Sequence, residues 1–392
     1  MANSGPCVRP MQPVIQSDLL GLFRGAIGLV LEVLLEQQVR EMVGARRYER
    51  MGSRKDHLNG TYMRRLLTSM GQVEIEVPRT RTQGSPLETI GRYNRRTSEI
   101  DEMVTAAYVQ GVSTRDMTRV TEALMGEGVG RSTVSRVTQR LSERVEQLRT
   151  ARITDRFPYL YLDATFIDAR WARAVENVSV LVAYGVDGDG KRRLLAVTIG
   201  SEESEASWTT LLEGLLERGL SGLRLVVSDA HAGLIKAVRR LLPEVAHQRC
   251  TVHLMRNVLA KTPHRLRGRV GSELSKIFQA SSRQSAQKAL EEFATGLGAQ
   301  LPEALSCLRD GFAAATRFYD FPRPHWPRIR SNNGLERLNA EIKRRVRAVG
   351  AFPDRDSALR LITAVALETT AVWGQRCYLD MALLGQKDPK AA

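Results

Sequence analysis

Three carboxylates in this 392-residue chain have the residue type and the setting to bind divalent metal ions. Asp163 ends the apolar run in YLYLDATF, and Asp229 ends the apolar run in LRLVVSDAH. Glu336 lies near the start of Ser331–Arg347, SNNGLERLNAEIKRRVR, which has helical spacing and many cations. Hard cations such as Mg²⁺ prefer oxygen ligands, and strand ends hold such ligands rigidly. Two strand-end aspartates and one helical glutamate therefore predict a two-metal site for phosphoryl transfer.

Each carboxylate also has a simpler interpretation. Asp163 could be a turn or cap residue, although a carboxylate ending a buried run is costly unless it is paired or metal-bound. Asp229 could cap the following helix, and Glu336 could pair with Lys343 or Arg337 on a solvated helix. If the fold brings the three acids to one cleft, all three simpler interpretations become less plausible.

Two other groupings offer weaker chemistry. Ser228 and His231 lie too close in sequence to form a catalytic relay with the aspartate between them, and no GxSxG nucleophile elbow is present. Cys250 and His253 have ligand-like spacing, but only His231 and His247 are nearby candidates to complete a zinc site. A polar pair packed near the active site is the favoured interpretation of Cys250 and His253.

The charge balance indicates a polyanionic partner. The chain has 58 basic and 43 acidic residues, a net charge of +15, which favours nucleic acid or an anionic membrane. A membrane span is disfavoured because the most apolar stretch, Leu19–Leu35, is interrupted by Arg24 and Glu32. The start of the chain does not have the order of a signal peptide. The four cysteines are scattered, which fits a reducing cytoplasm. We therefore expect a soluble cytoplasmic protein directed at nucleic acid, with no membrane partner.

The central region has the pattern of an α/β fold. Its expected elements follow in the order βββαβαβα, with strands at Pro158–Phe166, Asn177–Val186, Arg193–Ile199, Leu223–Val227 and Val245–Gln248 and a helix at Ser204–Arg218. This order is that of a ribonuclease-H-like fold, whose first strand carries one acid and whose fourth strand ends at the second. The polar, helical stretch His264–Tyr319 predicts an insertion before Glu336.

The first hundred residues predict a helix followed by a hairpin. The helix, Ser17–Val43, is apolar over more than one stripe, so we expect it to pack on another helix or another subunit. Gln72–Val77 alternates strictly and should be a strand that Pro78 ends. Arg46–Lys55 and Pro78–Pro86 are basic segments expected to contact DNA.

Thr97–Leu148 predicts three helices in a helix-turn-helix pattern. Ser113 should cap the second helix with Asp116, and Ser132 should cap the third. A glycine-bearing turn before a helix with a basic, polar face is typical of DNA-binding helix-turn-helix motifs. The simpler alternative is an ordinary three-helix bundle with a solvated face.

The predicted DNA-binding cations belong to two groups. The first lies on the helix-turn-helix pattern and the second follows Glu336, where cations beside a catalytic acid would hold the phosphates around the scissile bond. The residues are Arg115, Arg136 and Arg140 in the first group, and Arg337, Lys343, Arg344, Arg345 and Arg347 in the second.

Together these patterns predict an α/β protein with an interrupted catalytic core behind a mainly helical DNA-binding region. The expected regions are a flexible N-terminus (1–16), a dimerisation and DNA-binding region with a small β-hairpin (17–95), a helix-turn-helix-like domain (96–150), the first part of a ribonuclease-H-like core (151–263), an all-helical insertion (264–322) and the second part of the core (323–392).

The chain resembles a known family, the mutator-like DDE transposases of bacterial insertion sequences. The resemblance covers residues 46–378. It is carried by LDATF, ESEASWTTLLEGLLERGL, SDAHAGL, QRCTVHLMRNVL, SNNGLERLNAEIKRR and the trailing VGAFPD. One departure is visible in DHLNGTY, where Leu58 replaces the usual arginine and Thr61 is additional, which affects only the expected amino-terminal DNA contact.

The resemblance implies a transposase whose metal-binding triad is Asp163, Asp229 and Glu336, with Mg²⁺ or Mn²⁺, two ions, as cofactor. It implies supporting roles for Cys250, His253 and Trp208 near the active site. Members act as oligomers on double-stranded DNA, so we expect a homodimer on terminal inverted repeats and target DNA, in the bacterial cytoplasm with the nucleoid. The alternatives are a non-catalytic DNA-binding regulator derived from a transposase and a structure-selective nuclease of the same fold.

Overall fold

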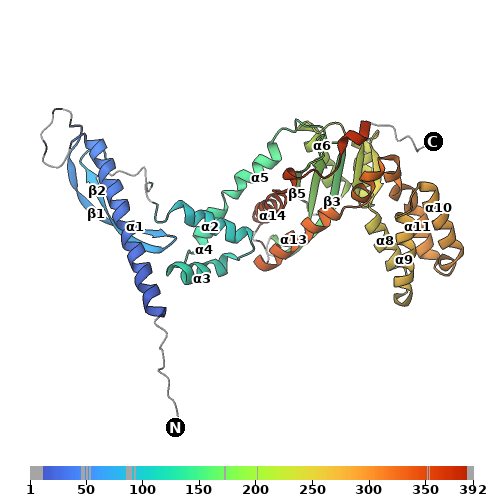
Figure 1. Ribbon diagram of the computed structural model, residues 1–392, viewed down its shortest axis with the longest axis horizontal. Coiled ribbons are helices and arrows are strands. Elements are labelled where there is room, and N and C mark those ends of the chain that lie inside the picture. Colours follow the sequence, from blue (N-terminus) through green and yellow to red (C-terminus); the bar gives the residue numbers. More distant parts are fainter. Residues whose placement is uncertain are drawn as a thin grey trace, which may run out of the picture. The chain divides into compact units, whose positions relative to one another are not determined.

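The computed structural model describes residues 12–45, 49, 52, 54–84, 91, 94–171, 174–200, 202–350, 352 and 354–385. Most of the predicted flexible N-terminus, most of the Arg46–Lys55 patch and the end of the Pro78–Pro86 loop lie outside these residues. The chain divides into two compact units, Met1–Gln139 and Arg140–Ala392, whose elements are labelled in Figure 1. Within the described part of the chain, no helix is both long enough and apolar enough to cross a bilayer.

The first unit begins with a long helix packed along a hairpin. The elements are α1 (Gln12–Val43), β1 (Leu58–Thr68) and β2 (Gly71–Thr80), and the two strands pair in antiparallel fashion. The predicted alternation is confirmed because Val73, Ile75 and Val77 are buried in a cluster with residues of α1.

Pro78 does not end β2 as predicted. The strand continues to Thr80, and Pro78 pairs with Thr61 next to a register irregularity of β1. A two-stranded sheet leaves each strand with one free edge, where a residue without an N–H is tolerated.

Three helices complete the first unit, and they pack on one another. Ser113 caps the second as predicted, since its hydroxyl accepts from the Asp116 N–H at 3.1 Å. Ser132 is not the cap of the third helix; Gly130 occupies that position. The helices are α2 (Ser98–Val109), α3 (Thr114–Met125) and α4 (Arg131–Thr138).

The predicted third helix, running to Leu148, is divided in the structure. It ends at Thr138 and resumes as α5 (Leu141–Thr150). The boundary between the two units falls at this break, so α5 belongs to the second unit. There it packs on β5 (Arg192–Gly200) and α14 (Arg355–Thr370).

The second unit is built on a five-stranded mixed sheet of order β5-β4-β3-β6-β7. β3 (Tyr159–Trp171), β4 (Ala174–Val186) and β5 form an antiparallel meander, whereas β6 (Leu225–Ser228) and β7 (Ala246–Arg249) run parallel to β3. Parallel neighbours require crossover connections, and helices supply them. These helices are α6 (Glu205–Glu217) and α7 (Ala232–Leu241).

The remaining elements of this unit are mostly helical. They are α8 (Thr251–Ala260), η1 (His264–Leu266), α9 (Arg267–Phe278), α10 (Arg283–Thr295), η2 (Leu297–Gln300), α11 (Pro302–Ala315), η3 (Arg317–Asp320), η4 (Arg323–His325), α12 (Trp326–Ile329), α13 (Asn333–Val349), η5 (Trp373–Gln375) and η6 (Met381–Gly385). The prediction of a helical stretch between the second and third acids is confirmed by α9, α10 and α11, which share a hydrophobic core of their own with α8.

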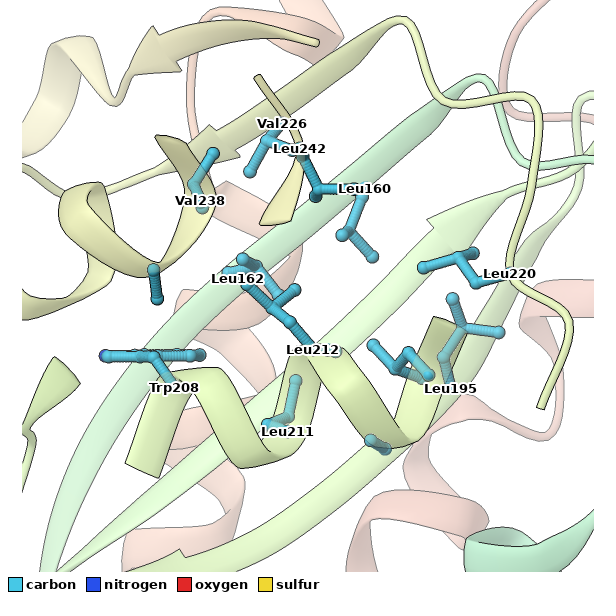
Figure 2. Packing of buried hydrophobic residues seen from close by; sticks show 14 of the residues in the cluster. Leu160, Leu162, Leu195, Trp208, Leu211, Leu212, Leu220, Val226, Val238 and Leu242 are labelled. Atoms are coloured by element: carbon cyan, nitrogen blue, oxygen red, sulfur yellow. The ribbon is translucent and has the colours of Figure 1, made fainter. Parts of the chain in front are cut away.

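Alternate residues of β3 face different layers of the fold. Leu160 and Leu162 lie in a core with Trp208 and Leu212 of α6 (Figure 2). Tyr161 points to the other face, where its ring stacks on Tyr184 at a centroid distance of 4.4 Å. Because side chains alternate along a strand, Asp163 belongs to the face of Tyr161 and not to the apolar core.

Candidate active site

The helix α13 is fastened to β3 at the level of Asp163. Asn332, buried at the start of α13, donates from Nδ2 to the Leu162 carbonyl at 2.9 Å. Further along, Asn339 donates from Nδ2 to Asp163 Oδ2 at 2.7 Å. Residues three apart share a helix face, so Glu336 lies on the side of α13 that carries Asn339 and faces the sheet.

Asp229 reaches the same edge of the sheet through strand register. Tyr161 of β3 pairs with Val227 of β6 in parallel, and Asp163 and Asp229 each follow two residues later. Carboxyl ends of parallel strands meet at one edge. The Asp229 carboxylate accepts from the N–H of Ala230 at 2.6 Å, which is a local turn contact.

Burial and the neighbouring carboxylates disfavour the charged form of Asp163. The side chain of Asp163 is buried, with 7% of the residue exposed. Burial raises the pKa of Asp163 to about 7, and the charges of Asp229, Glu336 and Glu203 add to that rise. A carboxyl whose charged form is disfavoured by other carboxylates is typical of a functional site.

Glu336 is held by two side chains of α8, the guanidinium of Arg256 and the imidazole of His253. Its Oε1 atom lies 3.0 Å from Arg256 Nη1 and 3.8 Å from His253 Nε2. Cys250 begins α8 and is fully buried; its Sγ accepts from the Asn332 N–H at 3.4 Å. Burial raises the pKa of this thiol to about 11, which keeps it protonated. Cys250 and His253 thus join α8 to α13.

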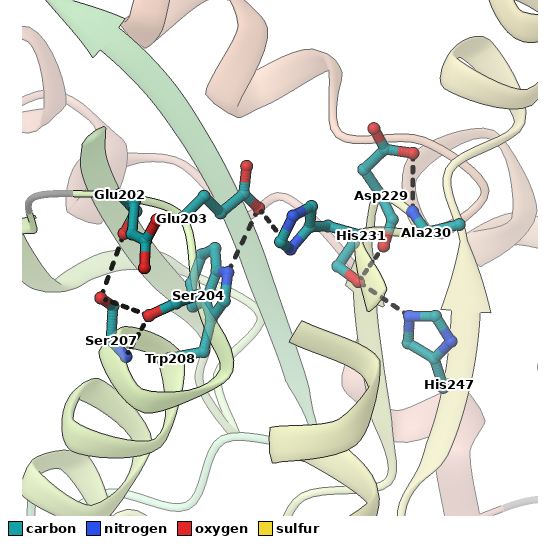
Figure 3. Close-up of polar contacts among 10 residues, drawn as sticks. Glu202, Glu203, Ser204, Ser207, Trp208, Asp229, Ala230, His231 and His247 are labelled. Atoms are coloured by element: carbon teal, nitrogen blue, oxygen red, sulfur yellow. Dashed lines mark hydrogen bonds and ion pairs between the residues drawn. The ribbon is translucent and has the colours of Figure 1, made fainter. Parts of the chain in front are cut away.

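A fourth carboxylate, Glu203, was missed by the sequence reasoning. Its Oε1 accepts from Trp208 Nε1 at 3.2 Å and lies 3.5 Å from His231 Nδ1 (Figure 3). Trp208, predicted as active-site support, is fully buried and therefore holds Glu203 firmly. Ser228 contacts Nε2 of His247 at 2.7 Å. The signal in the sequence was the pair of glutamates before Ser204, but no local pattern distinguished them from a solvated helix start.

The comparisons with known proteins agree on one family. The family model described as "Transposase, Mutator family" matches residues 8–376. The chain is 36% identical over 363 residues to the transposase for insertion sequence element ISRM5 of Rhizobium meliloti, covering 93% of this chain and 91% of that protein. It is 35% identical to the transposase for element IS256 in transposon Tn4001 of Staphylococcus aureus, covering 88% and 89%. The chain belongs to the Mutator family of transposases.

Among solved structures, the Drosophila P element transposase strand transfer complex aligns over 72% of this Mutator-family chain and 83% of that chain. The TM-score is 0.31 and the sequence identity is 10%. At these values the likeness carries no argument about the fold or the site.

The donor chemistry of the Mutator-family site fits a hard divalent cation. All three acids offer oxygen ligands; Glu336 Oε1 makes no hydrogen bond to a residue that the structure describes, and its contact is the ion pair with Arg256. The side-chain positions are less favourable: among the described residues, no three His, Cys, Asp or Glu side chains are grouped so that they could hold a metal ion. Cys250, His253, His231 and His247 likewise form no zinc-like group within that part of the chain.

The predicted DNA-binding cations are mostly exposed. Arg115 and Arg136 lie on the surface of the first unit, and Arg140 on that of the second. On α13, four of the five cations are exposed: Arg337, Lys343, Arg344 and Arg347.

Arg345 differs from its neighbours, and the expectation that it faces DNA conflicts with its burial. Only 8% of its side chain is exposed, and it lies 2.7 Å from Glu341 and 3.8 Å from Glu368 on α14. Helical periodicity turns this arginine inward, where it joins α13 to α14.

Proposed function

We propose that this chain binds the terminal inverted repeats of its own mobile element, frees a 3′ end by metal-dependent cleavage and joins that end to target DNA. The proposal rests on the parallel register of β3 and β6, which ends both strands beside Asp163 and Asp229, and on the hydrogen bond from Asn339 that ties the Glu336 helix to Asp163. The raised pKa of Asp163 supports it, because a divalent cation would relieve the repulsion that disfavours three charged acids together.

The strand order supports a ribonuclease-H-like core. Three antiparallel strands followed by two strands parallel to the first repeat the expected order of that fold. The helices α9, α10 and α11 lie between the second and third acids, where an insertion leaves the sheet intact. A ribonuclease-H-like strand order supports a phosphoryl-transfer function, but function depends on the site and not on the fold alone.

Asp163, Asp229 and Glu336 would hold Mg²⁺ or Mn²⁺, two ions, whose Lewis acidity serves phosphodiester cleavage and strand transfer. Asn339 fixes the Asp163 carboxylate through its 2.7 Å hydrogen bond. Arg256 approaches Glu336 from α8 and offsets its negative charge, and His253 lies 3.8 Å from the same oxygen.

The exposed cations on α13 bring the DNA backbone to this edge of the sheet. Arg337, Lys343 and Arg347 project from the helix that carries Glu336. Arg344 is also exposed, but it pairs with Glu341 at 2.7 Å. Phosphate contacts of this kind fix the position of a duplex without reading its sequence. The end sequence would be read by the first unit, in which α4 presents Arg136 on its exposed face.

The outer face of α1 supports a homodimer. Between Leu19 and Leu35 the only charged residues are Arg24 and Glu32. Both bond to the hairpin: Arg24 Nε donates to the Met70 carbonyl at 2.7 Å, and a Glu32 oxygen accepts from a β2 backbone N–H at 2.8 Å. An uncharged, apolar face is left exposed by Leu19, Leu22, Phe23, Leu29, Val30 and Val33.

A second copy would present the same apolar face to the first. Replacing Leu29 and Val33 with glutamate should therefore give a monomer in sedimentation. An oligomer unchanged by the two substitutions would place the subunit contact elsewhere.

Strand cleavage with purified full-length variants tests the proposed chemistry. Asp163→Asn, Asp229→Asn and Glu336→Gln should each abolish Mg²⁺-dependent nicking and joining of a duplex that carries the inverted repeats flanking the gene. Asp168→Asn is the matched control, because Asp168 lies exposed on the same strand β3. DNA binding with no cleavage by the wild type would favour a non-catalytic regulator, and cutting without joining or end preference would favour a nuclease.

A further inference from the structure

An unusual group of cations lies between the end of α8 and the first turn of α9, across η1. Lys261, Arg265, Arg267 and Arg269 fall within Lys261–Arg269, here called the basic turn, and all four are exposed. The sequence has no acidic residue between Arg256 and Glu273. Because nothing along the chain offsets these charges, the basic turn forms a local centre of positive potential.

The other cations of the same helical region are paired. Within the described part of the chain, no carboxylate lies within ion-pair distance of the four cations of the basic turn. By contrast, four ion pairs with N–O distances between 2.8 and 3.9 Å hold other cations of this region. They are Lys276–Glu273 at 2.8 Å, Arg283–Asp320 at 2.9 Å, Arg309–Glu291 at 3.6 Å and Lys288–Glu292 at 3.9 Å.

The basic turn is held in one shape by buried contacts. Thr262, 2% exposed, donates from Oγ1 to the Val258 carbonyl at 2.9 Å. Arg267 Nε donates to the Thr262 carbonyl at 3.1 Å, and Leu266 packs against the core of the helical region. Because the backbone of the turn is already ordered, its conformational entropy is not lost on binding.

The helix α8 connects the basic turn to the candidate active site. Arg256 of α8 contacts Glu336, and Lys261 follows five residues later at the end of the helix. A helix rises about 1.5 Å per residue, so Lys261 lies roughly 7.5 Å further along the axis. In Figure 1, α8 and α9 extend away from the sheet, which continues the positive surface outward from Glu336.

We propose that the basic turn binds the phosphate backbone of the DNA whose strand is held at Asp163, Asp229 and Glu336. This inference rests on the proposed function and extends the DNA-binding surface from α13 to the helical insertion. Lysine and arginine side chains on a fixed turn suit backbone phosphates and carry no base specificity. The contacts add affinity for end and target DNA alike.

The salt dependence of DNA binding tests the proposal on the full chain. The variant is Lys261→Gln/Arg265→Gln/Arg269→Gln, and the probe is a random-sequence duplex. The control, Lys276→Gln/Lys288→Gln/Arg309→Gln, removes the same charge from exposed, paired positions of the same helical region.

Each lost phosphate contact lowers the slope of log K against log salt by about 0.9. Three lost contacts should lower it by about 2.7 and weaken binding roughly 100-fold at about 0.15 M salt. The control should bind within about threefold of the wild type, because its cations are neutralised within the protein.

Two results would overturn the inference. The basic-turn variant could keep the wild-type slope, or both variants could lose slope equally, which would reflect net charge alone. A wild-type chain that does not bind DNA would instead contradict the proposed function. Equal thermal melting of both variants would show that the fold is intact.

Discussion

Replacing Asp163 with asparagine should stabilise the chain when metal is withheld. The carboxyl is buried beside Asp229 and Glu336, and its pKa is raised from 3.8 to about 7. Asparagine has nearly the same shape and can still accept the hydrogen bond that Asn339 donates at 2.7 Å. The substitution therefore removes the charge and retains the packing.

The size of the effect follows from the difference in proton affinity between the folded and unfolded chain. Folded Asp163 keeps its proton up to about pH 7, whereas the unfolded residue loses it near 3.8. The free energy of unfolding thus falls as pH rises through this window. At about 1.36 kcal/mol per pKa unit, the wild type loses roughly 4 kcal/mol by about pH 8, and the variant does not.

Calorimetry of the full chain in EDTA measures this difference. For a unit of this size, about 1 kcal/mol corresponds to roughly 2–4 °C, so Asp163→Asn should melt about 10 °C higher at about pH 8. At about pH 5 less than half of the difference should remain, because folded Asp163 is then protonated. Asp168→Asn, on the exposed part of the same strand, should melt with the wild type at both values.

Added Mn²⁺ should raise the melting temperature of the wild type and leave Asp163→Asn unchanged. The reasoning fails if the variant melts at or below the wild-type temperature at about pH 8, or if its advantage grows as the pH falls. Either outcome would mean that Asp163 is not a buried carboxyl whose charge is disfavoured.

Two further substitutions examine the surroundings of the site. Glu203→Ala should destabilise the fold by about 1–3 kcal/mol more than Glu203→Gln, because only glutamine retains an acceptor for Trp208 Nε1. Equal melting temperatures of the two variants would show that this hydrogen bond is unimportant. Cys250 should resist a thiol reagent at about pH 8 in the folded chain, while the exposed Cys377 reacts. Mass spectrometry of the labelled peptides measures this difference, and fast labelling of Cys250 would contradict its buried, protonated state.

Local patterns predicted much of the fold because the pattern and the packing agree. The apolar run before Asp163 is a buried strand as expected. The strands expected at Asn177–Val186 and Arg193–Ile199 pair as β4 and β5 across a turn in which the Asp187 carboxylate accepts from the Lys191 N–H at 2.8 Å. The order of strands and helices then placed the acids at one edge. Burial at that edge, together with the charges of Asp229 and Glu336, raises the pKa of Asp163.

What the sequence could not provide depends on contacts between distant segments. Arg345 lies among exposed cations in the sequence, but it is on the buried face of α13, where it pairs with Glu341 and reaches Glu368 on α14. Glu203 precedes an ordinary helix start, and it is held by the buried indole of Trp208 and by His231, which is distant in sequence. The helical pattern is divided at Gln139, and the part that follows, α5, packs on β5 and α14 within the second unit.

Direct metal binding tests the central claim most closely, that Asp163, Asp229 and Glu336 together hold divalent cations. Titration of the full chain with Mn²⁺, followed by electron paramagnetic resonance, reports bound ions without requiring DNA or activity. We expect saturable binding by the wild type and by Asp168→Asn, and at least about tenfold weaker binding by Asp229→Asn and Glu336→Gln. Binding of equal strength in all four proteins would contradict the account.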